Sequence, residues 1–310
     1  MTRFIATVVQ WAPEAHDAMA GARKAAAAIA EAARSGAQLV VFPETWLQCY
    51  PYWAGLSVRD PEYQAFREAW FASAISIPGP EIAIVQAAAA KHACHVVMSA
   101  QELAGGTVYA VQTFIGPDGT MLGNHRKLVP TLTERLVWGY GDGSDLDVHD
   151  TPLGRLGGLL CFEHQMAPAR HALCGLNIQL HAAAWPGHAF LDPVVDASMR
   201  QLAHENACFV FVARDIMSAD RVVQGMPQVH SGRDYWDAHG GSSIIAPGGQ
   251  YLVEPVFDRE TILTAEIDLA RISGAKWFVD GAGHYARPDV FQLQWDKRPK
   301  PAVKIITENG

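Results

Sequence analysis

At residues 157–164 the sequence is Gly157-Gly158-Leu159-Leu160-Cys161-Phe162-Glu163-His164. A short apolar segment leads into one thiol, and a polar, helix-favouring segment at residues 163–176 follows it. This order predicts a nucleophile at the end of a strand, with the following backbone N–H groups available to a developing oxyanion. A cysteine in an apolar run is more often a small buried hydrophobic residue, so the choice between the two interpretations depends on the rest of the chain.

Strand-forming and helix-forming segments alternate on both sides of Cys161. Before it, we expect strands at residues 4–11, 39–42, 95–102, 109–115 and 121–128, and helices at residues 16–37, 60–76 and 81–92. After it, we expect a helix to about residue 173, a helix at 192–206, and strands at 178–183, 208–214, 242–247, 250–255 and 261–267. Residues 131–150, rich in Gly and Asp, predict a long loop of the kind that carries function.

The alternation indicates one α/β domain at residues 1–291. A Lys- and Pro-rich tail, expected to be extended or mobile, follows at residues 292–310. The turn signals Pro117-Asp118-Gly119 and Gly248-Gly249 join neighbouring strands into hairpins. Hairpins among α/β units predict sheets in which parallel and antiparallel strands are mixed.

The composition argues against several classes of protein. The chain has 310 residues and a net charge of −8 with no basic tract, so a nucleic-acid partner is not expected. Its five cysteines are widely spaced and form no Cys-x-x-Cys pair, which argues against a disulfide framework and a zinc site. Residues 1–11 lack a signal-peptide pattern, and no apolar run approaches the roughly 18 residues that cross a bilayer. We expect a cytoplasmic protein with no membrane partner.

Three polar residues, Glu44, Lys127 and Cys161, are expected at strand ends in separate parts of the chain. Pro43 cannot continue a strand ladder, so Glu44 is expected just past a strand end, where α/β folds place their sites. A carboxylate can take the proton of a thiol, and an ammonium can lower the thiol pKa and stabilise an anion on the substrate. The alternatives are that Glu44 caps a helix and that Lys127 is a solvated surface charge.

Several motifs in order give the sequence a specific resemblance to the carbon–nitrogen hydrolases of the nitrilase superfamily, over residues 4–291. The motifs are Phe42-Pro43-Glu44, His125-Arg126-Lys127-Leu128 and Cys161-Phe162-Glu163-His164. Further stretches resemble the true nitrilase branch: Val129-Pro130-Thr131 with Glu134-Arg135 and Trp138-Gly139, then Gly141-Asp142-Gly143-Ser144, and Gly283-His284-Tyr285-Ala286-Arg287-Pro288-Asp289-Val290-Phe291.

The resemblance implies a role for each matching residue. Cys161 is the expected nucleophile, and Glu44 is the expected general base for the thiol and later for water. Lys127, helped by the backbone N–H of Phe162, is expected to stabilise the tetrahedral intermediate. Glu134 is expected to position the substrate and assist proton transfers; the alternative is a carboxylate paired with Arg135 or another cation.

The implied reaction converts an organic nitrile to its carboxylic acid and ammonia through a thioimidate and a thioester on Cys161, without metal or organic cofactor. If the tetrahedral intermediate expels the thiol instead of ammonia, the product is an amide. The alternatives are an amidase or carbamoylase with the same catalytic set, a cyanide hydratase or dihydratase, and a catalytically silent binding protein on the same fold. The Glu134-Arg135 and Trp138 signature argues against an amidase.

The sequence departs from the pattern of many nitrilases at two positions, with Phe162 in place of Trp and His164 in place of Asn. His164 is expected to face the pocket or to be bonded locally. Aromatic residues near the motifs are candidates for the substrate pocket, with core or interface packing as the alternative: Tyr52, Trp53, Trp138 and Trp185. The resemblance also implies a four-layer α-β-β-α sandwich with two mixed β-sheets, and a homodimer or larger homo-oligomer.

Overall fold

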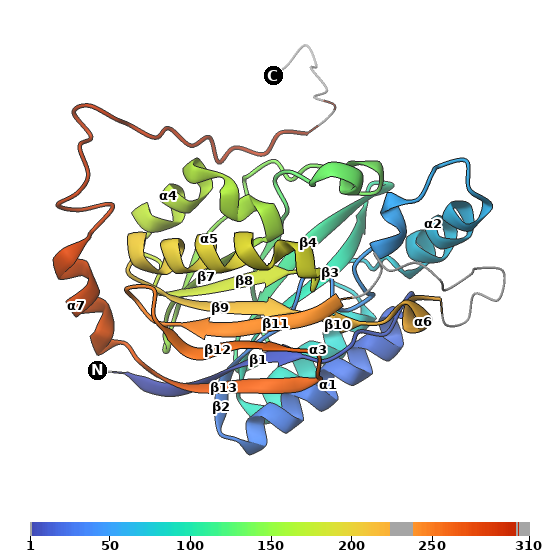
Figure 1. The fold of residues 1–310 in the computed structure, drawn as a ribbon, viewed down its shortest axis with the longest axis horizontal. Coiled ribbons are helices and arrows are strands. Elements are labelled where there is room, and N and C mark those ends of the chain that lie inside the picture. Colours follow the sequence, from blue (N-terminus) through green and yellow to red (C-terminus); the bar gives the residue numbers. More distant parts are fainter. Residues whose placement is uncertain (1, 224–237, 302, 304–310) are drawn as a thin grey trace, which may run out of the picture.

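Two β-sheets lie face to face, and helices cover their outer faces (Figure 1). The structure is a computed structural model that describes residues 2–223, 238–301 and 303. The first sheet has the order β13-β1-β2-β3-β4-β5, and the second has the order β10-β11-β9-β8-β7-β6 with β12 paired to β11. The strands of the first sheet are β1 (Arg3–Gln10), β2 (Ala37–Val41), β3 (His95–Ala104), β4 (Thr107–Ile115), β5 (Met121–Arg126) and β13 (Thr261–Asp268). Those of the second are β6 (Val148–Thr151), β7 (Gly154–Leu160), β8 (Leu180–Trp185), β9 (Phe209–Arg214), β10 (Ile216–Met217), β11 (Ala238–Ile245) and β12 (Tyr251–Phe257).

Both sheets mix parallel and antiparallel pairs, as the sequence predicted. In the first sheet β1, β2 and β3 are parallel, whereas β4 and β5 continue from β3 as an antiparallel meander. In the second sheet β7, β8 and β9 are parallel, and the hairpin β11–β12 adds antiparallel to β9. The parallel strands are almost wholly buried, which explains their continuous apolar runs.

The hydrophobic core is divided among the layers. Helices α1 (Ala18–Arg34) and α3 (Pro80–His92) pack on the outer face of the first sheet, and α4 (Ala167–Gly175) and α5 (Asp192–Glu205) pack on the outer face of the second (Figure 1). Apolar side chains from both sheets meet between them, among them Phe114 and Phe211. The predicted four-layer α-β-β-α sandwich is confirmed.

Gly158 allows the two sheets to approach closely beside the nucleophile. A Cβ atom at this position of β7 would lie 2.3 Å from Gln112 Oε1 of β4 and 2.4 Å from the Ala182 carbonyl oxygen of β8. No larger residue fits there without moving backbone. The close approach brings the end of β7, and therefore Cys161, toward the end of β5, where Lys127 lies.

Several elements differ from the sequence-based expectation. The expected loop at residues 131–150 contains the 3-10 turn η2 (Leu132–Leu136) and begins the short strand β6, whose sequence Val-His-Asp-Thr lacks an apolar alternation. The helix expected directly after Cys161 is a 3-10 turn, η3 (Cys161–Gln165), followed by α4. Pro168 stands in the first turn of α4, where its missing N–H costs no hydrogen bond.

The remaining elements lie around this sandwich. They are the 3-10 turns η1 (Tyr52–Gly55) and η4 (Ala189–Leu191), and the helices α2 (Pro61–Ser73), α6 (Ala219–Val222) and α7 (Ala270–Phe278). The sequence predicted α2 but not α6 or α7. Beyond α7 the chain passes through turns and irregular backbone and returns over α4 and α5 (Figure 1). There Trp295 Nε1 donates to the Gly143 carbonyl at 3.2 Å, and Lys297 pairs with Asp147 at 2.7 Å.

Among the described helices, none has the length and apolar character that crossing a membrane requires.

Candidate active site

Cys161 stands at the turn where β7 ends and η3 begins. Its side chain is buried, and its backbone φ is +49°, in the left-handed region that residues other than glycine rarely adopt. A non-glycine residue in this region carries strain, and such residues concentrate at functional sites. The sharp turn directs Cys161 away from the line of the strand and leaves the backbone of Phe162 beside the sulfur.

Two glutamates bind the ammonium of Lys127 inside the protein. Lys127 Nζ donates to Glu44 Oε1 at 2.7 Å and to Glu134 Oε2 at 2.6 Å, and all three side chains are buried. Glu44 follows β2, Lys127 follows β5, and Glu134 lies on η2. Burial alone lowers the pKa of Lys127, but the two carboxylates outweigh it and raise that pKa above its ordinary value. Lys127 is therefore a fixed buried cation, which contradicts the interpretation as a solvated surface charge.

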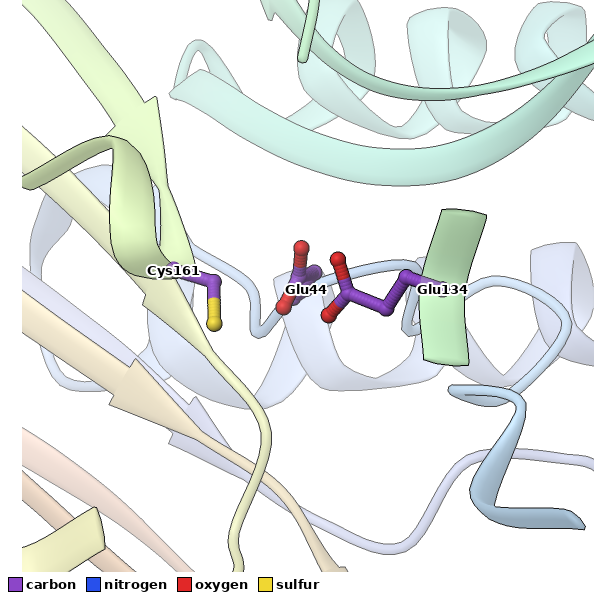
Figure 2. A group of neighbouring side chains, drawn as sticks. All are labelled: Glu44, Glu134 and Cys161. Atoms are coloured by element: carbon purple, nitrogen blue, oxygen red, sulfur yellow. The ribbon is translucent and has the colours of Figure 1, made fainter. Parts of the chain in front are cut away.

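Cys161 completes the cluster. One oxygen of Glu44, one oxygen of Glu134 and Cys161 Sγ all lie within 4.8 Å of one another. Figure 2 shows the three side chains directed into the same space from separate segments of the chain. These atoms are donors that a metal ion can use, but Lys127 Nζ already bonds to both carboxylates and supplies the positive charge. The structure thus brings together the four residues that the sequence predicted as catalytic.

The two carboxylates differ in their hydrogen bonds. Besides Lys127, Glu134 accepts from the Tyr50 hydroxyl at 2.6 Å and from the Thr131 N–H at 2.7 Å. Glu44 Oε2 is buried, and it has no hydrogen-bond partner among the residues that the structure describes. Burial raises the pKa of Glu44 to about 8, against the opposing effect of Lys127. Glu44 is therefore a basic carboxylate, and its oxygen Oε2 is available to a proton.

The environment of Cys161 favours the neutral thiol before substrate binds. Burial and the Glu44 carboxylate raise the pKa of Cys161 well above its ordinary value, whereas Lys127 and the backbone N–H of Phe162 lower it. Burial has the largest effect. Nucleophilic attack by Cys161 therefore requires a base to accept the thiol proton during the reaction.

A cavity of about 410 Å³ opens onto Cys161 and Glu134. Its lining includes the aromatic rings of Tyr50, Tyr52 and His188, with the largely exposed Phe190 among the other lining residues. The ring centroids of Tyr52 and His188 lie 4.8 Å apart, edge to face, so the wall of the cavity is a packed aromatic group. Burial lowers the pKa of His188 to about 4, which keeps this ring neutral at neutral pH.

Of the five residues predicted to bind substrate, only Tyr52 is part of this lining. Trp53 packs with Phe66 and Trp70, in the same hydrophobic cluster as Tyr52. The centroid of the Trp138 ring lies 5.2 Å from Lys127 Nζ, and this cation–π contact stabilises the lysine ammonium. Trp53 and Trp138 are therefore packed in the hydrophobic core, which was the alternative to a place in the substrate pocket.

His164 and Trp185 also lie outside the cavity lining. His164 Nδ1 is 2.6 Å from the Cys161 carbonyl oxygen, and the ring stacks on Trp185 with a centroid distance of 5.2 Å. His164 is therefore bonded locally beneath the turn of Cys161. Sequence reasoning missed Tyr50 and His188, which line the cavity. Neither residue belongs to a predicted strand or helix or to one of the motifs.

The chain is similar to known proteins in sequence and in fold. Residues 5–276 match the carbon–nitrogen hydrolase family. The chain is 37% identical to Nitrilase 2 of Arabidopsis thaliana, with 98% of this chain and 91% of the relative covered, and 38% identical to an aliphatic nitrilase of Sinorhizobium fredii, with 98% and 99% covered. The fold is that of Saccharomyces cerevisiae Nit3, a member of branch 10 of the nitrilase superfamily, with a TM-score of 0.74, 20% identity, and 91% of this chain and 96% of that chain covered. The chain therefore belongs to the carbon–nitrogen hydrolase family, and both of these near-full-length relatives are named as nitrilases.

Proposed function

We propose that this protein is a nitrilase that hydrolyses an organic nitrile to the carboxylic acid and ammonia, with Cys161 as the nucleophile. The observation that carries the proposal is the buried Lys127 ammonium, bonded to Glu44 and Glu134 beside a thiol that faces a cavity. An ammonium, a basic carboxylate and a thiol are the groups that addition to a carbon–nitrogen multiple bond needs.

In the first half of the reaction, the Cys161 sulfur bonds to the nitrile carbon while the thiol proton passes to Glu44 Oε2. The negative charge that develops on the nitrile nitrogen is stabilised by Lys127 and by the Phe162 N–H. The proton that Glu44 accepted then passes to that nitrogen, which gives a thioimidate and restores the Glu44 carboxylate. Water, deprotonated by Glu44, then adds to the same carbon. The tetrahedral species expels ammonia and leaves a thioester on Cys161.

In the second half, another water attacks the thioester carbon, and the carbon–sulfur bond breaks. The products are the carboxylic acid and the free thiol of Cys161, so the sum is one nitrile and two waters converted to one acid and one ammonia. Glu134, held by Tyr50 and Thr131, fixes Lys127 through both stages. If the tetrahedral species breaks its carbon–sulfur bond first, an amide is released instead.

The cavity supports a nitrile that carries an organic group. A space of about 410 Å³ walled by Tyr50, Tyr52 and His188 is far larger than cyanide requires, and its aromatic wall offers edge and face contacts to an aromatic or branched substituent. We therefore favour an organic nitrile over cyanide as the substrate.

The experiment is to measure ammonia, acid and amide over a panel of aromatic, arylacetic and aliphatic nitriles, cyanide and the matching amides, with Cys161→Ala as the control. Acid and ammonia from nitriles, absent in the Cys161→Ala protein, support the proposal. Turnover of amides alone would assign the protein to the amidases, and turnover of cyanide alone would make it a cyanide hydratase or dihydratase. No turnover of any compound, with Cys161 no more reactive to alkylation than Cys49, would support a silent binding protein.

We also propose that the protein works as a homodimer or larger homo-oligomer in the cytoplasm. Exposed aromatic residues on α7 and after it are suited to a second copy of the chain: Trp277, Phe278, Tyr285 and Phe291. All five cysteines are buried and unpaired, which suits a reducing compartment. Light scattering of the purified protein and fractionation of the source cell test the two statements, and a monomer or a secreted protein would contradict them.

A further inference from the structure

Three ionisable side chains behind the catalytic cluster form a group that the proposed reaction does not use. Asp145, His125 and Glu163, which we call the His125 clamp, are linked in a row. His125 Nδ1 lies 3.1 Å from Asp145 Oδ1, and His125 Nε2 lies 3.2 Å from each oxygen of Glu163. His125 and Glu163 are buried, and the Asp145 side chain is 27% exposed.

The Glu163 carboxylate of the His125 clamp accepts hydrogen bonds from the backbone next to Lys127 and from the backbone next to Cys161. Glu163 Oε1 accepts from the Leu128 N–H at 2.6 Å, and Glu163 Oε2 accepts from the Leu160 N–H at 2.8 Å. Leu128 follows Lys127, and Leu160 precedes Cys161. One carboxylate therefore joins the end of β5 in the first sheet to the end of β7 in the second.

The other end of the His125 clamp fixes the same strand from the opposite side. Asp145 Oδ2 accepts from the Arg126 N–H at 3.0 Å, so the backbone is held directly before and directly after Lys127. Burial alone lowers the pKa of His125, but the two carboxylates outweigh it and raise the pKa to about 10. At neutral pH the ring is a cation between two anions, and both its nitrogens donate.

We infer that the His125 clamp is the positioning device of this active site: Glu163 sets the separation between Lys127 and Cys161, and Asp145 with His125 holds Glu163 in place. The three are positioning residues, because none of them lines the cavity. Lys127 and Cys161 come from different sheets. The two hydrogen bonds of Glu163 connect Leu128, the neighbour of Lys127, to Leu160, the neighbour of Cys161. The inference rests on the proposed function, in which Lys127 must meet the charge that attack by Cys161 creates.

The test is the Glu163→Gln variant. The amide keeps the size of the side chain but places an NH₂ group against one of the two backbone N–H donors, which releases either β5 or β7. Misplacement by about 1 Å can cost about 10²-fold in rate, so we expect kcat to fall about 10²-fold while KM for the nitrile stays within a few-fold. The Asp145→Asn variant, altered at the more exposed end of the His125 clamp, should fold readily and lose kcat in the same direction by about 10-fold.

Glu102→Gln is the matched control. Glu102 is also a buried carboxylate in the first sheet, and it binds the Arg126 side chain at 2.7 and 3.0 Å, but none of its described hydrogen bonds reaches the backbone around Lys127 or Cys161. We expect this variant to lose stability and keep kcat. Equal loss of kcat in Glu102→Gln and Glu163→Gln, at matched fractions folded, would overturn the inference.

Alkylation separates positioning from loosening of the fold. In Glu163→Gln, iodoacetamide should still label Cys161 and should spare the buried Cys208, because alkylation does not need Lys127 at the position of the developing charge. Labelling of Cys208 together with the loss of kcat would mean that Glu163 only holds the fold, and a kcat within about 3-fold of wild type would show that it positions nothing. The wild-type protein and Cys161→Ala test the proposed function separately, because their outcome does not depend on Glu163.

Discussion

Tyr50 donates a 2.6 Å hydrogen bond to Glu134 from the wall of the substrate cavity. Since Glu134 in turn binds Lys127 at 2.6 Å, the cavity wall is connected to the buried cation by two short hydrogen bonds. A substrate that displaces Tyr50 therefore acts on the group that stabilises charge.

We expect Tyr50→Phe to lower kcat by about 10-fold, the effect of losing one hydrogen bond to a charged group, with the cavity otherwise unchanged. Steady-state kinetics on the best nitrile of the panel measure it, and an unchanged kcat would show that Lys127 is held well enough without Tyr50.

Cys161→Ala should abolish ammonia release and leave the fold intact. The substitution removes only a sulfur at a strand end, and alanine can take the same backbone conformation at no greater strain than cysteine. Circular dichroism and thermal unfolding check the fold beside the ammonia assay. Ammonia release that persists in this variant would exclude a covalent mechanism on Cys161.

Lys127→Ala should lower kcat by at least about 10²–10³-fold, because the variant loses the cation that meets the developing negative charge. It also leaves Glu44 and Glu134 facing each other without a counter-ion, so some loss of stability accompanies it. Measurement at a temperature well below the unfolding transition separates the two effects. A rate near that of wild type would make Lys127 a structural residue.

The activity should rise with pH as Glu44 ionises. Burial raises the pKa of Glu44 to about 8, so the carboxylate needed as a base is the minor form at neutral pH and becomes the major form above about pH 8. The expected profile of kcat/KM increases from about pH 6 to pH 8, and Glu44→Gln should abolish this limb together with about 10²–10⁴-fold of the rate. A profile that is flat over this range would contradict the assignment of Glu44 as the base.

The stability should depend on pH through His125. The native protein holds the His125 proton up to a pKa of about 10, whereas the unfolded chain releases it near the ordinary value of 6.5. Between these values the native state binds more protons, so the free energy of unfolding contributed by His125 is fully present below about pH 6.5 and is lost as the pH rises through 10. Urea unfolding at several pH values should show a steeper decline for wild type than for His125→Asn over this window. Parallel curves would show that the ring carries no such charge.

The sequence predicted the members of the buried cluster better than the lining of the cavity. Glu44 and Cys161 each follow an apolar run, and Lys127 lies in the motif His125-Arg126-Lys127-Leu128. Pattern and motif together therefore predicted side chains that the strand ends of the two packed sheets bring to one place. The cavity depends on how the segments between elements pack. Tyr50 and His188 reach it from irregular segments that no periodicity describes, whereas the tryptophans closest to the motifs fill the core.

The fold shows the same contrast between elements with a strong sequence pattern and elements without one. The buried parallel strands and the long helices carry strong apolar patterns and were predicted close to their observed bounds. The edge strand β6 is short and polar, and among the described strands it has a neighbour on one side only. In α7, Ile272 is the only buried residue. Such elements are defined by tertiary contacts that a local pattern does not contain.

The division of the active site between two sheets has a consequence for how the enzyme fails under stress. Glu44 and Lys127 belong to one sheet and Cys161 to the other, so a slight slip between the layers separates the reacting groups while every strand and helix persists. Heat inactivation should therefore set in several degrees below the loss of secondary structure, and it should be reversible on cooling as long as the layers remain in contact. The catalytic rate of this protein therefore responds to small changes in the relative position of the two sheets.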